Sequence, residues 1–269
     1  MVGYLAARAI QGVEHVSLAA YRRTIILDGD PGVLEIAPGG DGWLRLSAHL
    51  RHSDGVVHVA QQTRQIFNLD IDLDAANRHL AVDPVLGTLV AARPGLRVPG
   101  TWDAYELGVR AIIGQQVSVA GASTIAARLV QRHGTPVPGI EEFGLSHTFP
   151  SPATLARADL SGIGLTSART RAIQNFAGAL RDGVVRLDRG MSCEGIVASL
   201  VAIAGLGHWT AHYIALRMGK ADAFPSTDLG LRRALARLTS DATTPAALAQ
   251  RAERWRPWRA QAAIHLWLS

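Results

Sequence analysis

The stretch that decides the fold runs from Leu200 to Asp228 and reads LVAIAGLGHWTAHYIALRMGKADAFPSTD. Gly205 and Gly207 separate one apolar helical run from a second, which Thr210 opens. Two glycines at this spacing permit positive φ and put no Cβ in the way of a ligand. The first N–H groups of the second helix are unpaired, and together with the helix dipole they form an anion site. We therefore expect Gly205, Gly207 and Thr210 to bind a phosphodiester group. An ordinary helix cap followed by a tight turn would give the same pattern.

Asp228 follows Pro225-Ser226-Thr227 and precedes a predicted helix over Leu229–Leu238. Aspartate is a favoured N-cap residue, so its carboxylate is expected to accept hydrogen bonds from the first N–H groups of that helix. Capping is compatible with a chemical role, because a helix N-terminus favours the ionised carboxylate. From this residue alone, we favour the capping interpretation.

The stretch also matches a longer pattern, LxxIxGxGxWTAxYxxLRxG followed by DxFPxxD. This pattern resembles the signature of the helix-hairpin-helix DNA glycosylases, a superfamily named after its hairpin, its Gly/Pro-rich loop and its aspartate. It is most similar to the 3-methyladenine DNA glycosylase II, or AlkA-type, branch. The resemblance covers nearly the whole chain and includes the segments 93–100, 105–118, 253–259 and 265–267.

The resemblance implies a DNA glycosylase of base excision repair, a hydrolase that flips a damaged nucleotide out of double-stranded DNA and leaves an abasic site. The implied substrates are alkylated purines such as 3-methyladenine and 7-methylguanine, whose positive charge makes the base a good leaving group without a general acid. By the same resemblance, the Asp228 carboxylate stabilises the oxocarbenium character of the sugar and orients the attacking water.

Trp209 stands where relatives of the endonuclease III type, which also nick the strand, carry a lysine that attacks C1′. Without that amine, the chain resembles the branch that has no AP lyase activity. Lys220 lies off the matching position, and we expect it to be a solvated surface residue. Two alternatives stay open: a non-catalytic helix-hairpin-helix protein that binds DNA or recognises lesions, and a glycosylase with lyase activity.

Four aromatic residues match family positions that line the base pocket: Trp209, Tyr213 and Trp267, with Tyr4 from the N-terminal region. Aromatic faces attract cations, so a cationic alkylated purine would bind better than a neutral base. Gln116 matches the wedge that fills the gap left by the flipped nucleotide, where some relatives carry leucine. Core packing is the alternative for any aromatic side chain. We favour it for Trp43, Trp102, Trp255 and Trp258.

The rest of the chain has two regions of different character. Residues 21–50 contain three β-type runs separated by turns and predict an antiparallel meander, with helical spacing before it at Leu5–Ile10 and after it at Val56–Phe67. From about Asp83 onward, periodicity broken by Pro and Gly predicts helix after helix. These are Ala104–Ile113, Val119–His133, Pro152–Ala158, Ser167–Arg181, Glu194–Ile203, Thr210–Met218, Leu229–Leu238, Pro245–Arg254 and Arg259–Trp267.

The sequence therefore predicts an α+β fold. We expect a small antiparallel-sheet domain over residues 1–82 and a helical catalytic region over residues 83–269, with the helix-hairpin-helix at 200–218. By resemblance, the sheet domain is of the TATA-binding-protein half-repeat type. A second glycine-containing turn, at 160–166, is interpreted as an ordinary connection between helices.

Composition narrows the class of protein. The chain has 269 residues, of which 48% are hydrophobic, enough for a substantial core, and its formal net charge of +5 favours a polyanionic partner. The single cysteine, Cys193, excludes an internal disulfide and the four-thiolate iron–sulfur cluster that some relatives carry. We expect Cys193 to be partly buried and without a role.

We expect no metal site and no cofactor, apart from the Na⁺ or K⁺ ion on hairpin carbonyls that the resemblance allows. His208 and His212 have the spacing of metal ligands, but His208 lies at the turn, where it would face DNA. The sequence contains neither a long apolar segment nor a secretory signal. We therefore expect a monomer in the cytoplasm, associated with the nucleoid and not with a membrane.

Overall fold

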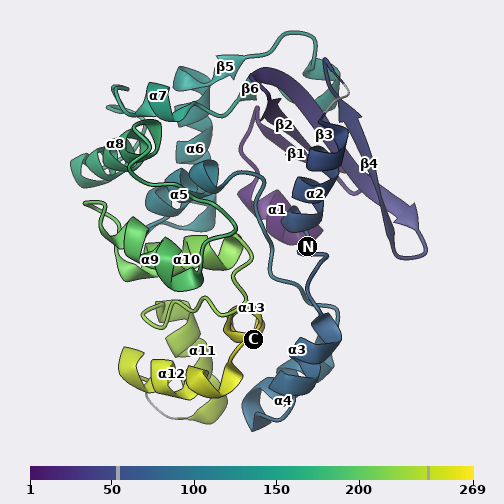
Figure 1. Cartoon of the computed structure of the whole chain (residues 1–269), viewed down its shortest axis with the longest axis vertical. Coiled ribbons are helices and arrows are strands. Elements are labelled where there is room, and N and C mark those ends of the chain that lie inside the picture. Colours follow the sequence, from purple (N-terminus) through teal and green to yellow (C-terminus); the bar gives the residue numbers. More distant parts are fainter. Residues whose placement is uncertain (53–54, 241–242) are drawn as a thin grey trace. The chain divides into compact units, whose positions relative to one another are not determined.

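The computed structural model describes residues 1–52, 55–240 and 243–269, and Figure 1 shows the order of its elements. The chain forms two compact units that interleave along the sequence. Unit 1 comprises Met1–Thr63, Tyr105–Arg186 and Ile203–Gly205, and unit 2 comprises Arg64–Ala104, Leu187–Ala202 and Leu206–Ser269. The sequence predicted two continuous domains that meet between residues 82 and 83, whereas each of these units combines several separate segments. The boundary at 82/83 stays a prediction.

Unit 1 contains an antiparallel sheet with the strand order β1-β2-β3-β4. The strands are β1 Glu14–Val16, β2 Tyr21–Leu27, β3 Asp30–Gly40 and β4 Trp43–His49. The tight turn between β2 and β3 consists of Asp28 and Gly29, both with positive φ, which is the geometry that matches the twist of a hairpin. The predicted meander is confirmed as β2–β4, whereas β1 was not predicted.

In the part of the chain that the structure describes, six helices lie in unit 1 or at its edges. They are α1 Val2–Arg8, α2 Val56–Ile66, α5 Ala104–Ile113, α6 Val119–His133, α7 Pro152–Leu155 and α8 Ser167–Arg181. Between α6 and α7 lie the short strands β5 Thr135–Pro136 and β6 His147–Thr148, with the 3₁₀ turn η1 Glu141–Phe143 between them. Gly108 of α5 allows α8 to approach closely, because a Cβ there would lie 2.3 Å from the ring of Phe176. The predicted bounds of α5, α6 and α8 are confirmed.

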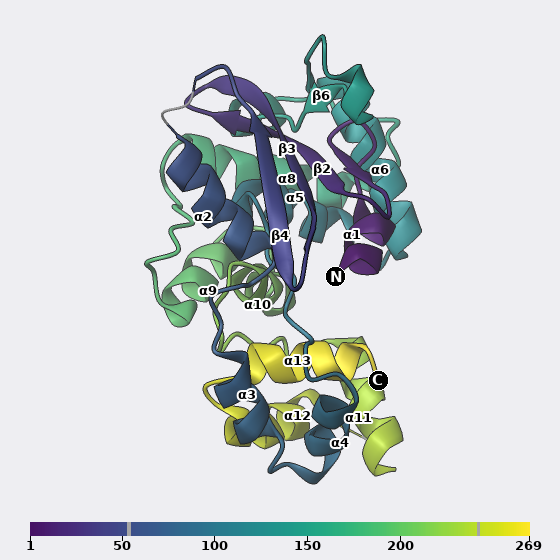
Figure 2. The same cartoon turned by 90° about the vertical axis from the view of Figure 1, so that its right-hand side faces the viewer.

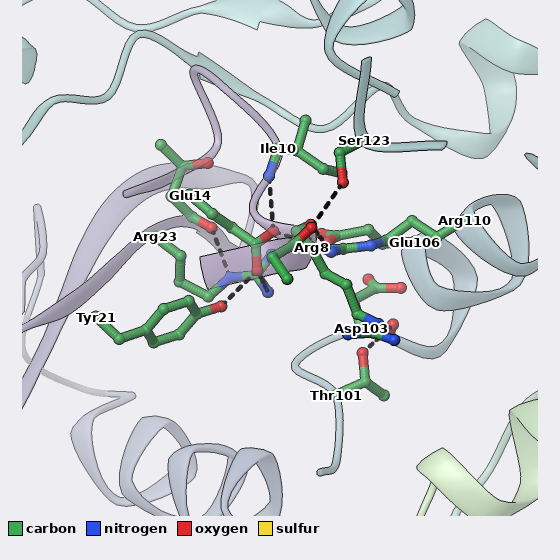
Figure 3. Close-up of polar contacts among 12 residues, drawn as sticks. Arg8, Ile10, Glu14, Tyr21, Arg23, Thr101, Asp103, Glu106, Arg110 and Ser123 are labelled. Atoms are coloured by element: carbon green, nitrogen blue, oxygen red, sulfur yellow. Dashed lines mark hydrogen bonds and ion pairs between the residues drawn. The ribbon is translucent and has the colours of Figure 1, made fainter. Parts of the chain in front are cut away.

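A buried cluster of charged side chains joins the sheet to α5 (Figure 3). Arg23 of β2 donates to Glu106 of α5 at 2.6 Å, and Arg110 of α5 donates to both Glu14 and Glu106 at 2.8 Å. The hydroxyl group of Tyr21 donates to Glu14 at 2.7 Å. Burial alone would raise the pKa of Glu14, but the positive charges of Arg110 and Arg23 outweigh it and lower that pKa. Each buried charge in this cluster is therefore paired.

Unit 2 is built from helices. They are α3 Leu73–Leu80, α4 Pro84–Ala92, α9 Cys193–Val201, α10 His208–Arg217, α11 Leu229–Thr239, α12 Pro245–Ala252 and α13 Arg259–Trp267, with the 3₁₀ turn η2 Glu253–Trp255. Residues 260–266 of α13 are all buried, because α4 and α11 pack against this helix (Figure 2). Helices α9 and α10 pack as a hairpin, as predicted. Helices α3 and α4 were not predicted. The α+β fold class is confirmed.

The four tryptophans assigned to packing differ in their surroundings. Trp255 is 1% exposed and lies in the core, as predicted, and Trp102 and Trp258 are half-buried. The prediction for Trp43 is wrong, since this side chain is 76% exposed. Trp43 begins the edge strand β4, and its neighbours Leu44 and Arg45 are exposed as well, so this end of the strand is open to solvent.

Among the described residues, the helices are all too short or too polar to pass through a lipid bilayer.

Candidate active site

The Asp228 carboxylate is held by three hydrogen bonds. Its Oδ1 accepts from the N–H of Leu231 at 2.8 Å, so Asp228 is the N-cap of α11, as predicted. The indole Nε1 of Trp267 donates to the same oxygen at 2.9 Å, and the indole Nε1 of Trp209 donates to Oδ2 at 2.7 Å. Both carboxylate oxygens are therefore oriented by side chains from α10 and α13, beyond what a cap requires.

Trp209, Tyr213 and Trp267 form one aromatic cluster in unit 2. Trp209 and Tyr213 lie four residues apart on α10 and therefore share a face of the helix. Their rings are stacked, with centroids 5.4 Å apart and an interplanar angle of 10°. Trp267 meets Tyr213 edge-on, with centroids 6.3 Å apart. All three side chains are half-buried, so each keeps part of its surface accessible to a ligand.

Arg217 supports this cluster from the next turn of α10, a role that the sequence analysis missed. Its Nη1 donates to the hydroxyl oxygen of Tyr213 at 2.8 Å, and its Nη2 donates to the carbonyl of Gly100 at 2.7 Å. Its Nε donates to the carbonyl of Pro99. The residue is only 8% exposed. Its place four residues after Tyr213 in the motif LRxG was the signal that could have identified it.

The hairpin between α9 and α10 depends on Gly205. This residue has a φ of 99°, and a Cβ there would lie 2.5 Å from the side chain of Ala172, so both conformation and space require glycine. Gly207 does not have the positive φ for which a glycine was expected. Its φ of −95° is available to any residue. The helix begins at His208 with Gly207 as its N-cap, and not at Thr210, which is 2% exposed.

Among the described residues, no side chain caps the N-terminus of α10. By contrast, Ser192, Thr166 and Asp228 cap the helices α9, α8 and α11 with a side-chain oxygen. A Cβ on Gly207 would meet open space, with no atom of another described segment within 4 Å. The first N–H groups of α10 therefore keep the arrangement that suits an anion. Because Thr210 is buried, its contribution there would come from its main-chain N–H.

Tyr4 and Gln116 lie in unit 1, whereas Asp228 and the aromatic cluster lie in unit 2. Tyr4, in α1, is half-buried, and the guanidinium carbon of Arg8 lies 3.9 Å from the centroid of its ring. One cation therefore already contacts that ring. Gln116 is exposed in the loop between α5 and α6 and has a φ of 54°. A left-handed conformation costs a non-glycine residue about 1–2 kcal/mol, so the surrounding loop must hold it in place.

Other candidates from the sequence have ordinary surroundings. Lys220 was expected to be a solvated surface residue, but it is half-buried and its Nζ donates to the carbonyl of Arg189 at 2.5 Å. The Nδ1 of His212 accepts from the N–H of Phe224 at 3.4 Å, and burial lowers its pKa. Cys193 is half-buried, as expected. Within the described ranges, no three His, Cys, Asp or Glu residues are grouped so that they could hold a metal ion.

Two family models match the chain. Residues 1–103 match the AlkA N-terminal domain, and residues 109–260 match the HhH-GPD superfamily base excision DNA repair protein. DNA-3-methyladenine glycosylase 2 of Escherichia coli is 36% identical over 99% of this chain and 92% of its own length. A "Probable bifunctional transcriptional activator/DNA repair enzyme AlkA" of Mycobacterium tuberculosis is 40% identical over 98% of this chain. The chain spans about half, 53%, of the length of that relative.

The solved structures include a similar fold. The 3-methyladenine DNA-glycosylase from Archaeoglobus fulgidus superposes with a TM-score of 0.85 at 23% identity, and the match covers 99% of this chain and 92% of that chain. At this identity the similarity concerns the fold, which agrees with the sheet of unit 1 and the helices of both units.

Proposed function

The chain belongs to the HhH-GPD superfamily of base excision DNA repair proteins, and from this membership we propose that it is a DNA glycosylase that excises alkylated purines from double-stranded DNA. The observation that carries the proposal is the Asp228 carboxylate, whose two oxygens are oriented by the indole N–H groups of Trp209 and Trp267. A cap needs only the bond to Leu231. Two further donors from an accessible aromatic cluster indicate a carboxylate placed for chemistry.

In the proposed mechanism, the flipped nucleotide presents its C1′ to Asp228. The electron pair of the C1′–N bond leaves with the base, and a cationic alkylated purine becomes neutral as it accepts that pair. The carboxylate balances the positive charge that develops on the sugar. Water then adds to C1′ and loses a proton to the carboxylate, which completes hydrolysis and leaves an abasic site.

The aromatic cluster contributes to base recognition and to positioning of the carboxylate. Trp209 and Trp267 would contact the extruded base with their rings while their N–H groups bind Asp228. A positively charged purine gains cation–π attraction from these faces, which a neutral base lacks. Tyr213 stacks on Trp209 and is held by Arg217, so we assign it mainly a supporting role. From the match to the family, Tyr4 is also proposed as a residue that contacts the base.

The proposed enzyme is monofunctional and has no AP lyase activity. A lyase needs an amine that forms a Schiff base with C1′. Trp209 occupies the position of that amine, and Lys220 is bound to the Arg189 carbonyl instead. Borohydride should therefore trap no covalent adduct between the protein and a DNA substrate, and a trapped adduct would establish the lyase alternative.

DNA binding is proposed to combine the hairpin with a wedge. The main-chain N–H groups at the uncapped start of α10, next to Gly205 and Gly207, would bind a phosphate. Gln116 would fill the gap in the stack and bind the orphaned partner base as the nucleotide is flipped. We propose that the protein acts as a monomer in this way.

An alkali ion on the hairpin carbonyls stays part of the proposal. The carbonyl oxygens of Ile203 and Gly205 accept no main-chain hydrogen bond from the described residues, so they suit a hard cation. Such an ion would supply positive charge to the bound phosphate. Replacing Na⁺ and K⁺ with tetramethylammonium at constant ionic strength should weaken binding to duplex DNA, and unchanged binding would remove the ion from the proposal.

The decisive experiment measures release of 3-methyladenine and 7-methylguanine from alkylated duplex DNA. In Asp228→Asn the side-chain oxygen still caps α11, but the carboxylate charge is lost. We expect kcat to fall by about 100–1,000-fold, as when a transition-state charge loses its stabilising partner. Unchanged release by this variant would refute the mechanism. Wild-type protein that binds abasic-site duplexes but releases no base would favour the non-catalytic alternative.

Asp83 provides a matched control in the same unit. It caps α4 and accepts a hydrogen bond from the indole Nε1 of Trp255 at 3.0 Å, so it shares the local structure of Asp228 without its proposed chemistry. Asp83→Asn should lower the melting temperature while leaving kcat unchanged below that temperature. A similar loss of kcat in both variants would mean that the effect of Asp228→Asn is structural.

A further inference from the structure

The loop between α5 and α6 presents Gln116 in a conformation that it does not adopt by preference. The residue has a φ of 54° and its side chain is exposed, so no packing of that side chain holds it there. An L-residue other than glycine returns to negative φ when it is free to do so. Contacts of the main chain around Gln116 must therefore impose the left-handed conformation.

Part of the constraint comes from turn hydrogen bonds close in sequence. The N–H of Gly114 donates to the carbonyl of Arg110 at 2.9 Å, and the N–H of Val117 donates to the carbonyl of Gly114 at 3.3 Å. Arg110 is itself held in the buried cluster with Glu14 and Glu106. The second bond closes a four-residue turn with Gln115 and Gln116 at its centre. Such a bond is compatible with either orientation of the peptide group between these two residues, so it does not by itself fix the conformation of Gln116.

Arg169 supplies that missing contact. Its guanidinium group reaches from the first turn of α8 and donates through Nη2 to the carbonyl of Gln115. That carbonyl belongs to the planar peptide group whose nitrogen is the main-chain N of Gln116. Because φ of Gln116 is the rotation about the bond from this nitrogen to Cα, holding the carbonyl fixes the plane from which φ is set. Arg169, Gln115 and Gln116 all lie in unit 1.

We infer that Arg169 is a positioning residue that holds Gln116 ready for insertion into the DNA stack. The inference rests on the proposed function, and within it on the wedge role of Gln116. A wedge that is already oriented loses less conformational freedom when the nucleotide is flipped. Without the guanidinium group, the peptide group between Gln115 and Gln116 can rotate, Gln116 relaxes to negative φ, and its side chain points elsewhere.

The test compares two substrates that carry the same single 7-methylguanine, one fully paired and one with the lesion in an unpaired bubble. Flipping from a paired stack needs the wedge, whereas a base in a bubble is already unpaired. In Arg169→Met we expect kcat/KM on the paired substrate to fall about tenfold or more, since small displacements of positioning groups have effects of up to about 100-fold. On the bubble it should stay within about twofold of wild type.

Two further variants complete the design. Arg171→Met removes the same charge two residues along α8, from an exposed arginine, and should leave the ratio of the two rates unchanged. Gln116→Gly removes the wedge and accepts positive φ, so it should reproduce the selective loss of Arg169→Met. The second readout is the fluorescence of 2-aminopurine placed beside an abasic-site analogue in a paired duplex. This fluorescence should rise when wild type or Arg171→Met binds. It should rise much less with Arg169→Met or Gln116→Gly.

The outcomes separate the inference from the proposed function. Equal losses on both substrates in Arg169→Met would overturn the inference, because they would indicate a phosphate contact or a general structural role. A selective loss in Gln116→Gly without one in Arg169→Met would also overturn it. If Gln116→Gly keeps full activity on the paired substrate, the wedge assignment and the inference both fail, while the Asp228 mechanism is judged separately by Asp228→Asn.

Discussion

His265 illustrates how one buried side chain couples stability to pH. It is fully buried in α13, and burial, together with the positive charge of Arg93, lowers its pKa to about 4 from an ordinary value of 6.5. In the unfolded chain His265 is protonated below pH 6.5, whereas in the folded protein it stays neutral down to about pH 4. Stability is unaffected by this group above pH 6.5 and is lost as the pH falls through that window.

We predict that this histidine lowers the free energy of unfolding by about 3 kcal/mol between pH 7 and pH 4. Urea unfolding of wild type and His265→Leu at both pH values measures the effect. The variant should lose less stability on acidification than wild type, because its side chain has no proton to gain. Equal losses in the two proteins would show that His265 titrates normally in the folded state.

At the level of single residues, the sequence predicted Asp228 as a cap and Trp255 as core, and the structure confirms both. It did not predict the indole bonds to Asp228, since these depend on α10 and α13 meeting in space and on the rotamers of two tryptophans. Arg169 was missed because its partner is a main-chain carbonyl, which leaves no trace in the sequence. Arg217 also donates to main-chain carbonyls, and its spacing of four residues from Tyr213 was not used.

Among the elements, α5, α6, α8 and α13 were predicted with the bounds that the structure shows, because each has a clear apolar period. Helices α3 and α4 were missed although Asp72 and Asp83 cap them and Pro84 occupies the first turn of α4. Those cap signals were present, but no helix was predicted from them. Strand β1 is three residues long, too short for alternation to be recognised.

We predict that Glu106→Gln is strongly destabilising, because it leaves Arg23 and Arg110 short of negative charge in a buried cluster (Figure 3). Breaking a buried ion pair in this way typically costs about 3–5 kcal/mol. The control is Asp70→Asn, which breaks an exposed pair with Arg64 and should change stability by less than about 1 kcal/mol. Chemical denaturation of wild type, Glu106→Gln and Asp70→Asn measures the free energy of unfolding of each protein. Equal losses in the two variants would contradict a stabilising role of the buried cluster.

For the whole molecule, the excess of 27 Lys and Arg over 22 Asp and Glu predicts that binding to duplex DNA weakens as salt rises. A plot of log K against log[NaCl] should be linear, with a slope of about −0.9 for each phosphate contacted. Fluorescence anisotropy with an abasic-site duplex measures it. Arg171→Met should shift this slope by no more than about one such contact. An affinity that does not change with salt would contradict an electrostatic interface.

The interleaving of the two units limits how the protein can be dissected. The chain passes between units at residues 63/64, 104/105, 186/187, 202/203 and 205/206. A gene fragment that encodes only the sheet would include Glu14 and Arg23 but lack Glu106 and Arg110, their partners on α5. Expressed alone, such a fragment would leave these charged side chains without their partners on α5, so engineering by truncation or by swapping halves with a relative has to keep α5 with the strands.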